Sequence, residues 1–158
     1  MGSNSLAAAL PVDRRQSATA RLIARGTSRL LHALGCCIIS ELALPSGRRA
    51  DLVALDADGT VWIVEIKSSA ADLRADTKWM EYRRHCDRLF FATSIDMRRD
   101  IFPDSAGLIV ADAFDAEIIC EAPEHPLPAA ARRSVMLSFA RAAALRLSAI
   151  HDPEGAHL

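Results

Sequence analysis

Two apolar runs separated by a single turn signal constrain the fold of this chain more than any other feature. The runs are Leu52–Leu55 and Val61–Val64, and the turn between them is Asp56-Ala57-Asp58-Gly59-Thr60. Strand-forming residues on both sides of an Asp-Gly step are typical of a β-hairpin. A three-residue loop with the glycine last makes Asp56 the partner of Thr60, and this pair fixes the register of the hairpin.

This register brings charged residues of the two strands together. Opposed residues of an antiparallel pair have a constant sum of residue numbers, here 116, which places Asp51 opposite Glu65. The same register places Arg49 opposite Lys67. Opposed side chains lie about 4.5–5.5 Å apart at Cβ, and alternate residues share a face, so we expect Asp51, Glu65 and Lys67 on one face. Two carboxylates and an ammonium group in one patch suit a divalent cation bound through oxygen, with the lysine placed to activate a water for attack on a phosphate.

These charges have a second explanation that involves no chemistry. Charged residues near strand ends are common, and most of them are solvated. The apolar runs predict an interior hairpin, however, and burying Glu65 and Lys67 there costs on the order of several kcal/mol unless they are paired or bind a metal. An ion pair between Glu65 and Lys67 would offset this burial cost even if the hairpin had no catalytic or binding role, so both explanations remain open.

The rest of the sequence predicts one α/β domain. Its 158 residues suit a single domain with a sizeable core. We expect a flexible lead-in over residues 1–16, one domain over residues 17–150 and a frayed tail over residues 151–158. Besides the hairpin, the expected elements are helices at 17–34, 69–85 (with a break near Ala75) and 129–150, and strands at 37–44, 86–93, 107–111 and 116–120. A helix between two strands favours a parallel pair, so we expect an α/β sandwich with a mixed central β-sheet flanked by helices.

Composition narrows the classes of function. The formal net charge of −1 gives no global nucleic-acid signature, so any basic surface must be local. The longest apolar runs are far below about 18 residues, so we expect no transmembrane span, and the N-terminal residues lack the cationic start of a signal peptide. The four cysteines, which are Cys36, Cys37, Cys86 and Cys120, lack zinc-knuckle spacing. Most of them lie in or beside apolar runs, where we expect burial in a reduced, cytoplasmic protein.

Three further polar residues are candidates for the same site. Glu41, near the end of the strand before the hairpin, is either a third carboxylate at the metal or the ion-pair partner of Arg48 or Arg49. Lys78 and Tyr82 are four residues apart in the helical region after the hairpin, so we expect them to share a helix face near the site. For Tyr82, core packing is the favoured explanation and ligand contact is the alternative.

The order helix–strand–strand–strand–helix–strand, with Asp51 early in the second strand and Glu65-Ile66-Lys67 at the end of the third, resembles the core of the PD-(D/E)XK nuclease superfamily. Ala50 stands where the superfamily motif has proline, at a position that varies. More narrowly, the chain resembles the MmcB-type DNA repair family of bacteria over most of residues 41–112. The stretches that carry this resemblance are Arg48–Leu52, Val64–Ser69, Asp76–Trp79, Glu81–Tyr82 and Cys86–Phe91.

The resemblance implies a divalent metal site. Mg²⁺ (or Mn²⁺) would be held by Asp51 and Glu65 with help from the Ile66 carbonyl. Lys67 would orient the attacking water or stabilise the charge of the phosphorane. Glu41 matches an additional upstream acid that many members use. The residues that we assign to nucleic-acid contact or to support of the ligands are Arg49, Ser68, Lys78 and Tyr82.

We therefore expect a DNA repair protein that acts as a divalent-metal-dependent DNA phosphodiesterase, either an endonuclease or an exonuclease. The alternative is a non-catalytic DNA-binding or partner-recruiting module with a nuclease-like fold, because some members of the superfamily bind nucleic acid without cutting it. The expected partners are DNA and other repair proteins, with no membrane. A homodimer remains open.

Overall fold

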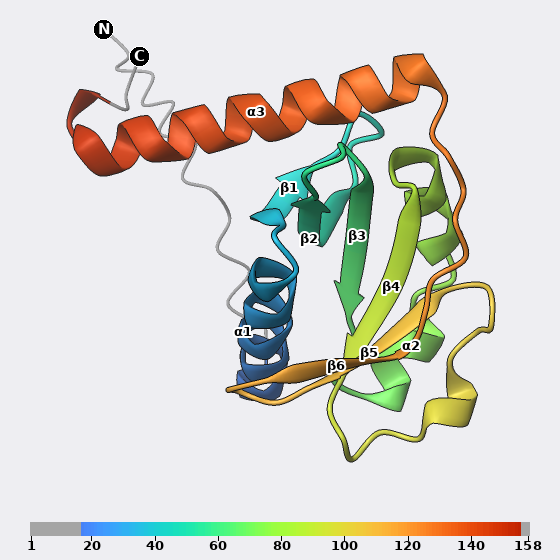
Figure 1. Cartoon of the computed structure of the whole chain (residues 1–158). Helices are drawn as coiled ribbons and strands as arrows, with labels where there is room; N and C mark the ends of the chain where they lie inside the picture. The colour runs from blue at the N-terminus through green and yellow to red at the C-terminus, as the bar shows by residue number, and fades with distance from the viewer. Residues whose placement is uncertain (1–16, 156–158) are drawn as a thin grey trace, which may run out of the picture.

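The computed structural model describes residues 17–155, which form one six-stranded β-sheet with helices on both faces (Figure 1). The predicted lead-in at residues 1–16 and the last three residues of the predicted tail lie outside this described part. The helices are α1 (Ala18–Ala33), α2 (Ala70–Ala75) and α3 (Ala129–His151), with 3₁₀ helices η1 (Trp79–His85) and η2 (Arg99–Ile101). The strands are β1 (Cys37–Ala43), β2 (Arg49–Leu55), β3 (Val61–Ile66), β4 (Arg88–Thr93), β5 (Gly107–Ala111) and β6 (Ala116–Cys120).

The strands lie in sequence order from β1 to β6, and the sheet is mixed. β1, β2 and β3 are antiparallel neighbours, β3, β4 and β5 are parallel, and β6 returns antiparallel to β5. α1 covers one face through Ile23 and Leu31, while η1 and α3 cover the other through Tyr82 and Val135. The predicted α/β sandwich with a mixed central sheet is confirmed, including the parallel pair on either side of the helical region.

The central hairpin has the predicted register. Its pairs keep the constant sum of 116 from Leu52 with Val64 up to the turn. At the turn the Gly59 N–H donates to Asp56 O at 3.1 Å, and the φ of Gly59 is 84°, a conformation that glycine adopts without strain. Every residue of β3 is buried, as expected for an interior hairpin.

The helical region after the hairpin is broken, and its second part is not α-helical. α2 ends at Ala75, and Asp76 leaves the helix with a ψ of 79° and accepts a hydrogen bond from the buried Lys67 ammonium. η1 then continues with the tighter 3₁₀ turn. Lys78, just before η1, is exposed whereas Tyr82 is buried. The prediction that Lys78 and Tyr82 share one helix face is therefore wrong, because Lys78 lies before η1 and a 3₁₀ helix, with three residues per turn, does not bring residues four apart onto one face.

A buried carboxylate, Asp87, holds α3 on the sheet. Its Oδ2 accepts from the Val61 N–H at 2.8 Å, and its Oδ1 accepts from the Leu127 N–H at 2.8 Å. The Arg132 guanidinium donates to both carboxylate oxygens, at 2.8 and 2.6 Å, and also to Gly59 O at 2.7 Å. We call these contacts the Asp87 clamp. The clamp joins the hairpin, the segment before α3 and α3 itself.

Cys36 and Cys86 are buried as expected, whereas Cys37 and Cys120 are exposed because they lie on the two edge strands, β1 and β6. All four cysteines are free thiols. Within residues 17–155, no helix has the length and apolar character that a membrane span requires.

Candidate metal and nucleic-acid site

The candidate site lies where the ladder between β2 and β3 ends. The last backbone pair is Leu52 with Val64. Beyond it, the Asp51 N–H donates to Glu65 Oε1 at 3.1 Å, and the Ile66 N–H donates to Asp51 Oδ2 at 2.8 Å. Two side-chain carboxylates thus take the place of backbone carbonyls at the end of the hairpin. The structure brings Asp51 and Glu65 together, each bonded to the strand that carries the other.

Burial dominates the electrostatics of this carboxylate pair. Burial first, and then the Asp51 charge, raises the pKa of Glu65 to about 8. Burial also raises the pKa of Asp51, although the Ile66 N–H and the Lys67 ammonium oppose this change. A half-buried and a buried carboxylate this close do not ionise together readily. A cation bound between Asp51 and Glu65 would therefore remove the main cost of charging the pair.

The donors of the pair fit a divalent cation that takes few protein ligands. Each carboxylate uses one oxygen for a backbone hydrogen bond, and no donor within residues 17–155 bonds the other oxygen, Oδ1 of Asp51 or Oε2 of Glu65. In the same part of the chain, no group of three or more His, Cys, Asp or Glu side chains is placed to hold a metal. Mg²⁺ commonly binds through one or two carboxylates and completes its shell with water. The residues present fit such an ion.

Lys67 follows β3 directly and is buried. Its Nζ donates to Asp76 Oδ2 at 2.7 Å. Its charge also lowers the pKa of both Asp51 and Glu65, so the ammonium lies within electrostatic reach of the pair. Asp76 is not among the predicted site residues. The signal for it is a lysine that is expected to be buried, and so needs a counter-charge, together with an acid beside the predicted break in the helix.

Glu41 lies in β1 opposite Asp51, but it makes no backbone pair there. Its backbone is left-handed, with a φ of 51°, which interrupts the regular ladder. The exposed Glu41 side chain has its Oε1 4.0 Å from Arg49 Nη2, and its charge contributes to the raised pKa of Asp51. Of the two roles predicted for Glu41, the ion pair with Arg49 is the one seen, at the edge of the carboxylate pair.

Tyr82 supports the site from η1. Its hydroxyl donates to Arg49 O at 3.1 Å, and the Arg48 guanidinium lies 5.5 Å from the centre of its ring. Burial, and then the Glu65 charge, raises the pKa of Tyr82, so the phenol stays protonated at neutral pH. Arg48 is itself held by Glu81, whose Oε2 lies 2.6 Å from its Nε. Tyr82 packs in the core and fixes the start of β2, which is the favoured of its two predicted roles.

Ser68 and Lys78 differ in how closely they are tied to the site. The Ser68 Oγ donates to Asp72 Oδ2 at 2.7 Å and accepts from Ser17 Oγ at 3.2 Å. These bonds place the start of α1 beside the start of α2, one residue after Lys67. Lys78 is exposed. Within residues 17–155 its side chain makes no hydrogen bond or ion pair, so the structure does not join it to the carboxylate pair.

Comparisons with known proteins bear on the family and the fold of this chain. A family model described as "DNA repair protein MmcB-like" matches residues 8–154. Among solved structures, the chain is similar to the SPO1766 protein of unknown function from Silicibacter pomeroyi, with a TM-score of 0.84 and 41% identity over 89% of this chain and 96% of that one. SfsA from Pyrococcus furiosus, solved in complex with Ca²⁺, matches with a TM-score of only 0.32 and 15% identity over 61% of this chain and 59% of that one. No curated protein matches the sequence.

Proposed function

This chain belongs to the MmcB-like family of DNA repair proteins, and we propose that it is a divalent-metal-dependent DNA phosphodiesterase of the PD-(D/E)XK type. The observation that carries the proposal is the pair of half-buried Asp51 and buried Glu65, in which each carboxylate is bonded to the opposite strand. The Lys67 ammonium is near enough to lower the pKa of both acids. Such a site would cut DNA either within a strand or from its end.

The proposal assigns a role to each residue of the site. Asp51 and Glu65 would hold Mg²⁺ or Mn²⁺, and the Ile66 carbonyl would be the third protein ligand. The bound ion supplies Lewis-acid polarisation of the phosphodiester and acidification of the attacking water. Lys67, fixed by its bond to Asp76, orients that water and keeps further N–H donors for the charge that develops on the phosphate.

The proposed DNA contacts come from cations at the exposed edge of the site. Arg49 and Lys78 are both exposed, and their charges suit phosphate oxygens. Ser68 and Tyr82 act indirectly, by holding α2 and the start of β2. Glu41 is paired with Arg49 in this structure. A phosphate bound by Arg49 would leave Glu41 available as the additional acid of the site.

A cleavage assay tests the proposal. The purified protein is expected to cut labelled single-stranded, duplex or flap DNA with Mg²⁺ or Mn²⁺ and to stop when EDTA is added. Asp51→Asn and Lys67→Met remove charge at nearly constant size, and each should lower the cleavage rate by about 100-fold or more. The matched control is Asp58→Asn, which changes an exposed acid at the opposite end of the same hairpin and should cut at the wild-type rate. Equal cleavage by all four proteins would contradict the proposal.

A non-catalytic DNA-binding or partner-recruiting module is the second candidate function. Two observations favour it: Lys67 is already paired with Asp76, and among residues 17–155 no third metal-binding side chain joins the two carboxylates. DNA binding would then depend on salt and survive both Asp51→Asn and Glu65→Gln. Calorimetry separates the two candidates. Absence of Mg²⁺ or Mn²⁺ binding by the wild type favours the module, whereas binding that Glu65→Gln abolishes favours the phosphodiesterase.

A further inference from the structure

The second half of α3 carries large apolar side chains that the sheet does not cover. Val135, in the first half, is buried against the sheet. Further along, Leu145 is 65% exposed, Leu147 is 56% exposed and Ile150 is 75% exposed. Figure 1 shows the reason: this end of α3 extends past β1, the last strand on that side. Large apolar side chains that gather on one exposed element mark an interaction surface.

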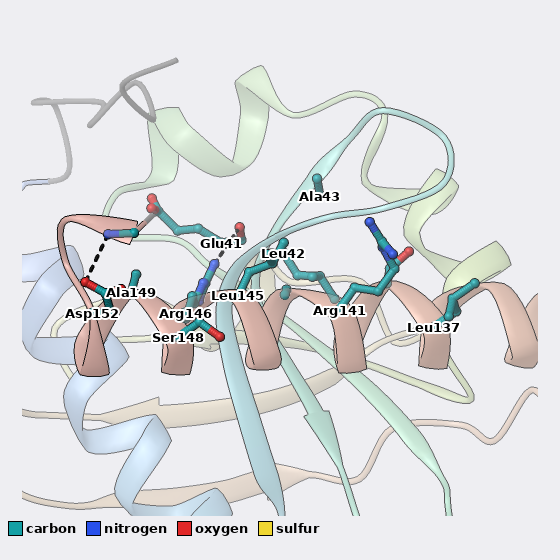
Figure 2. Close-up of a pocket in the computed structure, with 13 residues that line it drawn as sticks. Glu41, Leu42, Ala43, Leu137, Arg141, Leu145, Arg146, Ser148, Ala149 and Asp152 are labelled. Carbon is teal, nitrogen blue, oxygen red and sulfur yellow. Dashed lines mark hydrogen bonds between the residues drawn. The ribbon is translucent and has the colours of Figure 1, made fainter. Parts of the chain in front are cut away.

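Leu137 and Leu145 border a groove between α3 and the end of β1, with a volume of about 770 Å³ (Figure 2). Small and apolar residues line much of it, including Leu42, Ala43, Ala142 and Ala149. Its charged residues are two bases and two acids, namely Arg141, Arg146, Glu41 and Asp152. An apolar surface with balanced charge does not favour a polyanion such as DNA. It suits a second copy of the same surface, because a two-fold interface brings identical patches face to face.

The spacing of the groove residues on α3 is self-complementary. Arg141, Leu145 and Ser148 are spaced by four and three residues, so they lie on one face of the helix. Asp152, the C-cap residue four positions after Ser148, lines the same groove. In an antiparallel two-fold pair of helices, facing residues have a constant sum of residue numbers. Arg141 with Asp152 and Leu145 with Ser148 both give 293. A single register therefore makes the Arg141–Asp152 ion pair twice and places each Leu145 over the small Ser148 and Ala149 of the other copy.

From these observations we propose that the protein is a two-fold homodimer in which the second halves of α3 pack antiparallel, each filling the groove of the other. Arg141 is available for this contact, because it forms no ion pair within residues 17–155. The Leu145 side chains lie near the dimer axis, where burial removes the apolar surface that a single chain leaves in water. The proposal is independent of the proposed function.

Light scattering coupled to size-exclusion chromatography tests the dimer. The wild type is expected at twice its chain mass of 17.1 kDa. Leu145→Glu should raise the dimer dissociation constant by about 30-fold or more, the effect of losing a central interface side chain. The matched controls are Ile95→Glu and Phe114→Glu, at side chains that are 73% and 71% exposed elsewhere on the molecule, and both should remain dimers.

A charge exchange tests the register without relying on a disruptive variant. Arg141→Asp places two acids against each other and should give a monomer. Adding Asp152→Arg restores opposite charges across the axis and should restore the dimer. This recovery would show that Arg141→Asp gives a monomer through its charge and not through misfolding. A wild type that is monomeric at every concentration overturns the proposal. In that case another protein, or another part of the same chain, covers the groove. Dimers that persist in Leu145→Glu, or an exchange that fails to restore the dimer, overturn it as well.

Discussion

Burial and the Asp51 carboxylate raise the pKa of Glu65 to about 8, so an ionised Glu65 opposes folding when no cation is bound. Glu65→Gln keeps an oxygen for the Asp51 N–H and removes the charge. In EDTA we expect this variant to be as stable as the wild type, or more stable by about 1 kcal/mol. Mg²⁺ or Mn²⁺ should raise the melting temperature of the wild type but not of the variant.

Thermal unfolding with and without the ions measures both effects of Glu65→Gln. The matched control is again Asp58→Asn, which should respond to the ions as the wild type does. A loss of several kcal/mol in EDTA would point the other way. It would mean that a charged Glu65 acts as a structural partner of Lys67, as the purely structural explanation of the hairpin charges requires.

Asp76 is the one acid that forms an ion pair with Lys67 within the described residues. Asp76→Asn keeps a hydrogen-bond acceptor but leaves a buried ammonium without its counter-charge, so we expect the free energy of unfolding to fall by about 2–3 kcal/mol. The same change in a Lys67→Met background should cost little, because no charge then needs Asp76. Urea titrations of the four proteins measure this coupling, and purely additive losses would contradict it.

At the residue scale, sequence and structure agree where local rules decide. The Asp-Gly turn determines the hairpin register, and the register brings Asp51 and Glu65 together. The partner of Lys67 could not be obtained in this way, because it depends on where the chain goes after the hairpin. The left-handed backbone of Glu41 is likewise unpredictable from its type, since glutamate has no preference for that conformation.

At the scale of elements, the Asp87 clamp contributes to the way stability depends on acid pH. Burial alone would raise the pKa of Asp87, but Arg132 and two backbone N–H groups outweigh burial and hold the pKa below its ordinary value. A carboxyl with a lowered pKa stabilises the folded chain fully above its unfolded pKa of about 4. This contribution is lost as the pH falls through the lower, folded pKa. We therefore expect the free energy of unfolding to decrease below about pH 4.

Asp87→Asn tests this assignment. It removes the charge that Arg132 needs, so we expect a loss of about 3 kcal/mol at neutral pH and a weaker decrease of stability in acid. Asp58→Asn, in the exposed turn, should keep the wild-type pH dependence. Urea titrations at a series of pH values measure the slopes. Equal acid slopes for wild type and Asp87→Asn would show that other carboxylates cause the decrease.

The helices also show where sequence patterns are insufficient. The break near Ala75 follows from local signals, and it is found there. The 3₁₀ form of η1 is not predictable from propensity, because Asp76 is drawn to Lys67 and Tyr82 to the backbone of Arg49. Tertiary contacts thus decide the form of the segment, and with three residues per turn Lys78 and Tyr82 do not share a face.

At the scale of the whole molecule, the sequence predicts the mixed sheet and the helix from residue 129 onward, and both are found. It does not predict that α3 is longer than the surface beneath it. The apolar pattern of a helix shows which residues can be buried, but the extent of burial depends on the width of the sheet. The exposed Leu145 and Ile150 are the visible result.

The Asp87 clamp also has a consequence for the order in which a growing chain acquires its structure. Arg132 lies 45 residues after Asp87 and 73 residues after Gly59, and it bonds both. During synthesis the hairpin and Asp87 are made before the arginine that joins them exists. Until then, a nascent chain carries Asp87 without its cation. The Asp87 clamp therefore forms only after α3 has been translated. A transcript truncated before α3 encodes a sheet without this clamp.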